Sequence, residues 1–128
     1  GKKAGKGFYD YQGKDKTLWP ELTTLYPPRA DQPTQQELVD RLMFIQANEA
    51  ARCFEENVVR SVADANIGSI FGWGFAPHQG GALQFINAMG VQRFVARSRE
   101  LARQHGARFE PAAILVQMAQ ENARFQDA

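Results

Sequence analysis

The stretch GWGFAPHQGG, from Gly72 to Gly81, holds four glycines, one proline and two aromatic residues between two apolar patterns of helical spacing. A dinucleotide-binding loop needs G-x-G-x-x-G directly after a strand, so that backbone N–H groups reach the pyrophosphate. Here the GWG triplet follows a helical pattern, and Pro77, three residues beyond Gly74, has no N–H to donate. The stretch therefore predicts a joint between helices. We expect Gly72 to end one helix, Gly74 to permit a reversal, and Gly80 with Gly81 to begin the next.

Helix signals extend in both directions from this joint. Thr34 and Glu37 have the spacing of a capping box, Asn57 is a suitable left-handed stop, and Ser61 can cap a second helix. The expected helices are a short one after Pro20, then 34–57, 61–72, 83–90, 91–104 and 110–119, with Pro111 in the first turn of the last. The residues expected to face the core are Leu38, Leu42, Ile45, Ala47, Ala50, Ala51, Phe54, Ile67, Ile70, Phe71, Leu83, Phe85, Ile86, Met89, Phe94, Val95, Leu101, Ile114, Leu115, Met118 and Ala119. No alternation of β-branched residues competes, which predicts an all-α fold: a single compact bundle of about five helices.

Composition narrows the function classes. The 128 residues carry 15 Lys and Arg against 14 Asp and Glu, a net charge of +1, which gives no broad electrostatic case for nucleic acid or an anionic membrane. We expect no nucleic-acid partner. No apolar run reaches the ~20 residues of a membrane span, and no signal-peptide pattern is evident. Cys53 is the only cysteine, which fits a reducing, cytoplasmic setting.

Residues suited to catalysis are isolated in the sequence. His78 lies in the joint and His105 near the end of a helix, but neither has an adjacent carboxylate or nucleophile, and two separate histidines do not make a metal site. Glu55 and Glu56 are adjacent on a helix and point about 100° apart, which favours a solvated helix end over an acid/base pair. Cys53 is more typical of a small buried hydrophobic residue than of a reactive thiol.

The fourth long helical pattern carries two basic stripes. Arg93 and Arg97 are four residues apart, as are Arg99 and Arg103, and such pairs can meet phosphates. Glu100, three residues beyond Arg97, partly offsets the charge. A solvated helix face is the preferred interpretation.

The N-terminal segment is too aromatic for a free linker. Phe8, Tyr9 and Tyr11 lie among glycines and lysines, and Trp19 follows shortly after. Together with the small-residue face of the first long helix, they offer more apolar surface than a domain of this size buries alone. We identify Phe8, Tyr9, Tyr11 and Trp19 as candidate interface residues.

Three segments in order carry a resemblance to a known family: GKGFYDY at 5–11, ELVDRLMFIQANEAARCFEENVV at 37–59, and ADANIGSIFGWGFAPHQGGALQFINAMG at 63–90. The chain resembles the C-terminal helical domain of L-3-hydroxyacyl-CoA dehydrogenases. It is most similar to the last repeat of that domain in the multifunctional fatty acid β-oxidation enzymes, whose α-subunit joins an enoyl-CoA hydratase to the dehydrogenase. The most specific motif is G-F-x-P-x-x-G-G, met by Gly74, Phe75, Pro77, Gly80 and Gly81.

The resemblance implies a division of the chain and a fold. Residues 1–16 would be the tail of a preceding helical repeat, because GKGFYDY closes such repeats in the family. Residues 17–128 would be the helical domain itself, with a fold like the C-terminal domain of 6-phosphogluconate dehydrogenase.

The resemblance also implies which chemistry is absent. Family members use a histidine–glutamate pair on an upstream NAD-binding domain, and the first helical repeat adds an asparagine in a V-N-R-L pattern. The matching residues here are 39–42, with Asp40 in place of the asparagine. An ionised aspartate accepts but does not donate a hydrogen bond, so this repeat is expected to be non-catalytic. No catalytic, cofactor-binding or metal-binding residue is expected, and NAD and acyl-CoA belong to the parent enzyme.

The resemblance thus implies a structural, dimerisation-type domain of an NAD-dependent enzyme that oxidises (S)-3-hydroxyacyl-CoA to 3-oxoacyl-CoA in lipid metabolism. Its partners would be the preceding dehydrogenase domains of the same polypeptide, or a second copy of the chain. The alternative is a free-standing helical protein–protein interaction module without an enzymatic role. A complete small enzyme that uses His78 is the least favoured interpretation.

Overall fold

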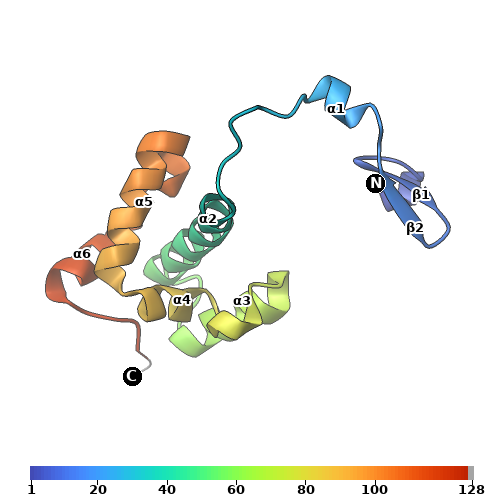
Figure 1. Cartoon of the computed structure of the whole chain (residues 1–128). Helices are drawn as coiled ribbons and strands as arrows, with labels where there is room; N and C mark the ends of the chain where they lie inside the picture. Colours follow the sequence, from blue (N-terminus) through green and yellow to red (C-terminus); the bar gives the residue numbers. More distant parts are fainter. Residues whose placement is uncertain (127–128) are drawn as a thin grey trace. The chain divides into compact units, whose positions relative to one another are not determined.

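The computed structural model describes residues 1–126, and the chain divides into two compact units. The first unit is Gly1–Thr34 and the second begins at Gln35 (Figure 1). The chain is mostly helical, as predicted, but a two-stranded sheet in the first unit was not expected. The expected bundle of about five helices corresponds to the second unit alone, and residue 16, after which a boundary was expected, lies inside the second strand of the first unit.

The first unit is built around a β-hairpin. After the 3₁₀ turn η1 (Lys2–Ala4), strands β1 (Tyr9–Gln12) and β2 (Asp15–Leu18) pair antiparallel, with Tyr9 opposite Leu18. A two-residue turn joins the strands, and its first residue, Gly13, has a φ of 62°. That left-handed conformation at the first turn position favours glycine and is the signal from which the hairpin could have been predicted. A short helix, α1 (Leu22–Leu25), follows close to the expected place after Pro20.

The second unit is helical throughout its regular structure. Its α-helices are α2 (Gln35–Glu55), α3 (Val62–Trp73), α4 (Ala82–Met89), α5 (Val91–His105) and α6 (Ala113–Glu121), with 3₁₀ turns η2 (Pro77–Gln79) and η3 (Ala107–Phe109). The predicted stops are confirmed at Asn57, which has a φ of 58°, and at Gly90 and Gly106, which follow α4 and α5. Helix α6 begins later than expected, so Pro111 precedes the helix and is not in its first turn.

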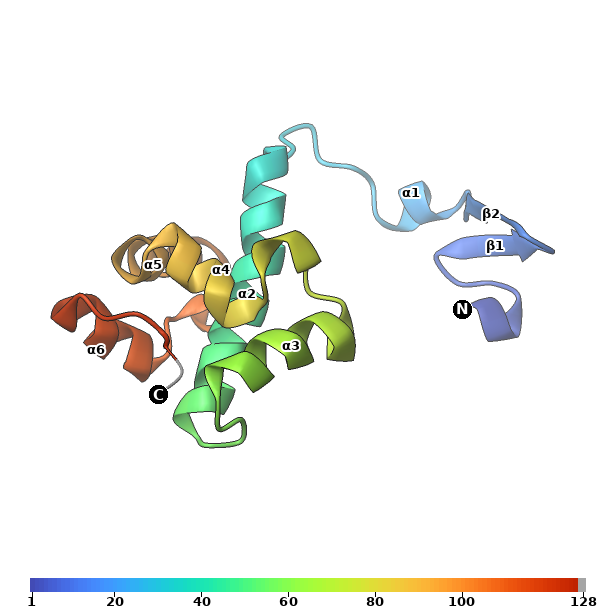
Figure 2. The ribbon, with the colours of Figure 1, turned by 90° about the horizontal axis from the view of Figure 1, so that it is seen from below.

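Helix α2 is the central element of this unit. It packs against α3, α4, α6 and η3, while α5 packs against α4, α6 and η3. Figures 1 and 2 show α3 on one side of α2 and the α5–α6 pair on the other. Because small residues line the buried face of α2, neighbouring helices approach it closely. Those residues are Ala47, Ala50 and Ala51.

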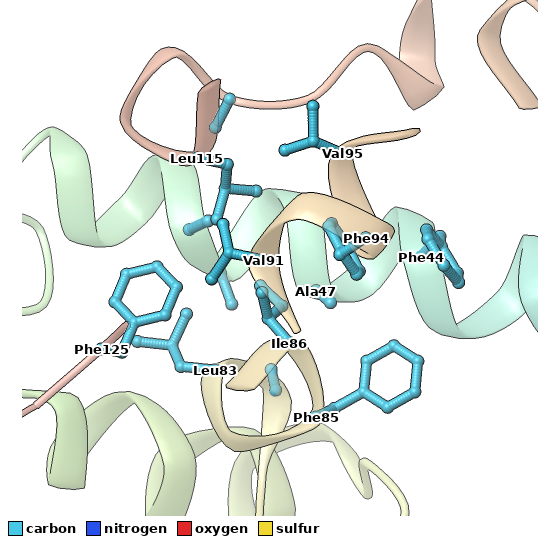
Figure 3. Close-up of a cluster of buried hydrophobic side chains, with 14 of the residues drawn as sticks. Phe44, Ala47, Leu83, Phe85, Ile86, Val91, Phe94, Val95, Leu115 and Phe125 are labelled. Carbon is cyan, nitrogen blue, oxygen red and sulfur yellow. The ribbon is translucent and has the colours of Figure 1, made fainter. Parts of the chain in front are cut away.

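A cluster of phenylalanines forms the centre of the core (Figure 3). Phe44 of α2 stacks on Phe94 of α5 with ring centroids 4.4 Å apart, and the edge of Phe85 from α4 meets both rings. Phe44 and Phe94 are completely buried. Offset-stacked and edge-to-face pairs each add about 0.5–1.5 kcal/mol beyond the burial of their area. These three rings therefore hold α2, α4 and α5 together.

Several residues that the periodicity assigned to the core are exposed instead. Leu38 and Leu42 in the first half of α2 are 46% and 65% exposed, and Ile67 and Phe71 of α3 are 56% and 86% exposed. The physical reason is that no helix of this unit covers the face of α2 that carries Leu38 and Leu42, or the outer face of α3, whereas the buried positions of α2 begin at Phe44. An apolar stripe on a helix predicts that the stripe will be covered, but not by which element.

In the part of the chain that the structure describes, no helix is both long enough and apolar enough to cross a membrane.

Candidate functional site

The GWGFAPHQGG stretch joins α3 to α4 through η2. Helix α3 continues through Gly72 to Trp73 and is capped by Gly74, whose φ of 78° is left-handed, so the prediction that Gly72 stops the helix is wrong by two residues. The N–H groups of Gly74 and Phe75 then donate to the carbonyls of Ile70 and Ser69. Phe75 is buried against Phe85, with ring centroids 6.1 Å apart, which fixes the exit of the joint into the core.

Two side chains of α3 cap the beginning of α4. The Asn66 Oδ1 accepts hydrogen bonds from the N–H groups of Leu83 and Gln84 at 3.0 and 2.9 Å. The hydroxyl of buried Ser69 accepts from the Ala82 N–H at 3.0 Å and donates to the Asn66 carbonyl at 2.7 Å. The first N–H groups of a helix lack acceptors within the helix, so α3 supplies the acceptors for the first N–H groups of α4. These hydrogen bonds therefore fix the start of α4 against α3.

Only glycine fits at position 81, because there is no room for a Cβ and because the backbone conformation disfavours other residues. A Cβ placed on Gly81 would lie 2.5 Å from both the Cα and the Cβ of Asn66, and the φ of Gly81 is 107°. No side chain fits at that separation, because the contact is with backbone that cannot move aside. Gly80 is also left-handed, at a φ of 76°. These positions serve helix packing, and Pro77 occupies the first position of η2.

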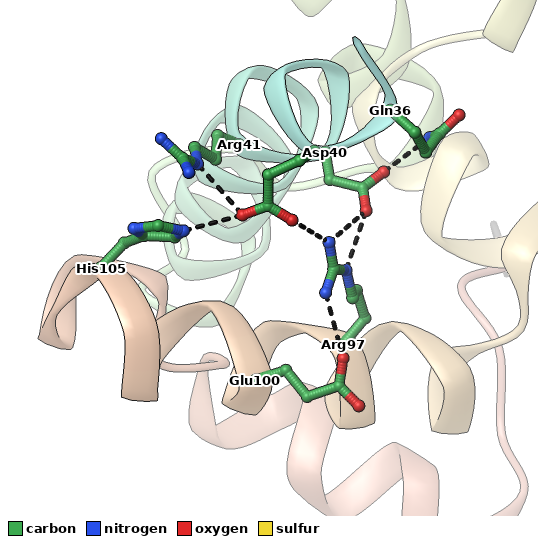
Figure 4. A network of polar contacts seen from close by, with 7 residues as sticks. Gln36, Asp40, Arg41, Arg97, Glu100 and His105 are labelled. Carbon is green, nitrogen blue, oxygen red and sulfur yellow. Dashed lines mark hydrogen bonds and ion pairs between the residues drawn. The ribbon is translucent and has the colours of Figure 1, made fainter. Parts of the chain in front are cut away.

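A network of charged side chains joins the start of α2 to the middle and end of α5 (Figure 4). The Arg97 guanidinium donates to Asp40 Oδ2 at 2.8 Å, to Glu37 Oε2 at 2.6 Å and to Glu100 Oε2 at 3.1 Å. Glu37 Oε1 accepts from Arg41 Nε at 3.1 Å and lies 2.7 Å from the His105 Nε2. This cluster is the largest group of ionisable side chains that the described residues bring together.

The network shifts the ionisation of its members. Hydrogen bonds from His105, and then from Arg97 and Arg41, lower the pKa of Glu37 to about 2, against a smaller opposing effect of burial. Burial disfavours the charged form of Arg97, but the hydrogen bonds that it donates to Glu37, Asp40 and Glu100 outweigh this effect and raise the pKa of the guanidinium. Both groups are therefore held in their charged forms. A glutamate with so low a pKa is a poor general base near neutral pH.

Asp40, which was compared with an active-site asparagine on the basis of sequence resemblance alone, lies in this network. Asp40 accepts from Arg97 on one oxygen and from the Gln36 amide at 2.8 Å on the other. Both oxygens of its carboxylate are therefore hydrogen-bonded, and the bond to Arg97 stabilises the packing of α2 against α5. The structure gives no support to phosphate binding by the stripe of Arg93 and Arg97, because three carboxylates already surround the Arg97 guanidinium.

The remaining candidates lie apart from one another. His78 is exposed in η2, with its ring 3.3 Å from the Gln79 amide, and Cys53 is half-buried on α2. Glu55 is not merely a solvated helix end, because its Oε1 accepts from the Ile114 N–H at 2.8 Å and so caps α6. His105 was expected to be isolated but pairs with Glu37, a residue 68 positions away.

The aromatic candidates of the first unit occupy the hairpin. Tyr9 and Tyr11 share one face with ring centroids 6.5 Å apart, and the Lys16 ammonium lies 5.0 Å from the Tyr9 ring. Both tyrosines are half-buried, as is Trp19. The backbone N–H of Trp19 donates to the Phe8 carbonyl at 3.0 Å and so extends the pairing of the two strands. Phe8 itself is 68% exposed.

Within residues 1–126, no three His, Cys, Asp or Glu side chains are grouped so that they could hold a metal ion. No protein-family model matches the chain. The geometry of the described residues is that of helix docking: capped helix ends, an inter-helix ion-pair network, and large apolar side chains left exposed. A nucleophile with an oriented base is not among the contacts that they make.

Proposed function

We propose that this chain is a structural, dimerisation-type domain of an NAD-dependent 3-hydroxyacyl-CoA dehydrogenase that acts in fatty acid β-oxidation. The observation that carries the packing role is the exposure of large apolar side chains on two helices of a well-packed unit. Leu38 and Leu42 lie four residues apart on α2, and Ile67 and Phe71 lie four apart on α3. Paired exposed apolar residues of this kind mark an interface, because single scattered ones are more usual on a free surface.

The non-catalytic part of the proposal is supported by Asp40. A group that stabilises a developing oxyanion must donate a hydrogen bond, and the Asp40 carboxylate accepts from Arg97 and Gln36. In the parent enzyme, NAD and the acyl-CoA would be bound by other domains, and the oxidation of (S)-3-hydroxyacyl-CoA would take place there. This chain would contribute stability and shape.

The partners in this proposal are the preceding domains of the same polypeptide, or a second copy of the chain. Burying Phe71, Ile67 and Leu42 in an interface gains about 1.5–3 kcal/mol for each side chain that becomes fully covered. These gains offset the loss of freedom on association only if several such residues are covered together. The cytoplasm is the proposed location.

The experiment compares three samples by NADH oxidation with acetoacetyl-CoA: this chain alone, the upstream part of its reading frame alone, and the two mixed. We expect activity to appear or rise only on mixing, together with co-elution of the two parts. Absence of both effects would replace the proposal with a helical interaction module of another system. Turnover by this chain alone would contradict both.

A further inference from the structure

A groove of about 550 Å³ lies between α2 and α3 and is not used by any contact described so far. Helix α2 contributes Gln46, Ala50 and Cys53 to its walls, and α3 contributes Ala65, Gly68 and Gly72. Its volume is within the range of about 300–1,000 Å³ that is usual for binding pockets. Its walls are mainly apolar. It is therefore a site that water occupies at a cost in free energy.

The shape of the groove suits a helix. The α3 wall runs from Asp64 to Trp73, which at 1.5 Å per residue is about 13 Å, or between two and three helical turns. Gly68 and Gly72 lie four residues apart on this wall, and a Cβ placed on either meets nothing within 4 Å. The backbone of α3 is thus open to close approach by another helix, since the separation of packed helices depends on the side chains at their contact.

The α3 wall of the groove ends at an aromatic side chain, Trp73. The Trp73 Nε1 donates to the Gln46 Oε1 at 3.0 Å, so the indole bridges from α3 to α2. Trp73 is nevertheless 54% exposed. An indole with its N–H satisfied and its body exposed offers a rigid apolar contact for an incoming side chain.

The charge of the groove selects its occupant. Among the described residues that line it, the ionisable acids are Glu49 and Asp64, and none is Lys or Arg. The neighbouring Arg52 lies 3.1 Å from Glu49 and also donates to the Glu110 carbonyl at 2.6 Å, so its guanidinium is already bound. Arg52 therefore offsets the charge of Glu49, whereas Asp64 has no ion pair among the described residues. A cation on the occupant is attracted by the Asp64 carboxylate, and a phosphate or carboxylate is repelled.

We propose that this groove binds an amphipathic helix of a partner protein, whose apolar stripe is flanked by a lysine or arginine that faces Asp64. A second copy of the chain fits less well. Its exposed apolar stripe on α3 carries Asp64 itself, and the stripe on α2 is accompanied by Arg41, which is bound to Glu37. The inference does not depend on the dehydrogenase assignment, because it rests on the shape and charge of the groove.

The test uses the full chain with Trp19→Phe, so that the fluorescence of Trp73 alone reports on the groove. The probe is a helical peptide of about 14 residues with leucine and alanine on one face and two flanking lysines; its twin has glutamates in place of the lysines. We expect the lysine peptide to shift the Trp73 emission to shorter wavelength and to bind at least about tenfold more tightly than the twin.

Two variants separate groove binding from surface association. Gly68→Leu fills the groove at a helical position with open space, and we expect it to weaken binding of the lysine peptide by at least about tenfold. Ala88→Leu, at an exposed position of α4 outside the groove, should leave binding unchanged. Gly72→Leu repeats the test at a second position, and circular dichroism checks the folding of each variant.

Three results would overturn the proposal. The first is no binding of the lysine peptide up to about 1 mM. The second is equal binding of the two peptides, or equal binding by wild type and both glycine variants. The third is a dimer of the chain, seen by sedimentation, that Gly68→Leu dissociates, because the groove would then hold a second copy.

Discussion

At Gly81 a single missing side chain allows α4 to dock on α3. We predict that Gly81→Ala lowers the free energy of unfolding by about 2–4 kcal/mol, because its Cβ would overlap the backbone of Asn66 in a left-handed conformation. Gly68→Ala is the matched control: it lies in the interior of α3 with open space around it and should stabilise the chain by up to about 1 kcal/mol. Urea denaturation measures both. Equal effects of the two substitutions would contradict the role given to Gly81.

A second prediction at this scale concerns Glu37. Its pKa is lowered from 4.5 to about 2 in the folded chain, so its contribution to stability is complete above pH 4.5 and is lost as the pH falls toward 2. Glu37→Gln should therefore be less stable than wild type at pH 7, and the difference should shrink between pH 4.5 and pH 2. Denaturant midpoints across that range measure the effect. The exposed Glu56→Gln is the control, and a constant difference between Glu37→Gln and wild type at all pH values would contradict the prediction.

Among the elements, α4 depends most on a neighbour for its start. Its N-cap position is Gly81, which has no side chain to accept a hydrogen bond, and the Asn66 oxygen of α3 takes that role. We predict that Asn66→Ala destabilises the chain by about 1–2 kcal/mol, because two N–H groups lose their acceptor. Asn66→Asp keeps an acceptor and adds a charge favoured at a helix N-terminus, so its stability should stay within about 0.5 kcal/mol of wild type. Thermal unfolding distinguishes the two, and equal loss in both would contradict the capping role.

Helix ends were largely predictable because their signals are local. Ser61 accepts from the Asp64 N–H at 3.0 Å as its sequence position indicates, and Gly106 follows α5 as expected. The end of α3 was misplaced because Gly72 and Gly74 are both plausible stops, and the left-handed turn occurs only at Gly74. The hairpin was missed because its strands are short and polar, and its turn signal, Gly13, is a single residue.

Contacts between elements that are far apart in the chain could not be predicted from the sequence. Glu37 was interpreted only as a capping-box residue, whereas the structure shows its carboxylate bound to Arg97, 60 positions away. Periodicity placed Leu42 and Phe71 on helical stripes correctly, but it does not reveal which stripes another element of the same unit will cover. The interface proposed from the structure therefore differs from the one expected from the sequence. The sequence pointed to the aromatic N-terminal segment and the small-residue face of α2, and not to the exposed stripes of Leu42 and Phe71.

For the whole molecule, the apolar stripes on α2 and α3 are exposed, so substitutions there should weaken association with a partner without lowering the stability of the fold. We predict that Leu42→Gln with Phe71→Gln changes the free energy of unfolding by no more than about 1 kcal/mol in total, because both side chains are largely exposed. The same double variant should weaken association with the proposed upstream domains by at least about tenfold. Chemical denaturation and analytical ultracentrifugation measure the two quantities. The control is Arg99→Gln with Arg103→Gln, on the exposed face of α5, and equal weakening by both pairs would contradict the assignment of the interface.

The most direct measurement of the central claim is the rate of NADH oxidation with acetoacetyl-CoA when this chain is added to the upstream part of its reading frame. We expect no activity from this chain alone and a rise in activity on mixing that saturates as the two parts associate. The Leu42→Gln, Phe71→Gln variant should require a higher concentration for the same rise. A rate that does not change on mixing, with no association between the parts, would contradict the claim that this chain is a packing domain of a dehydrogenase.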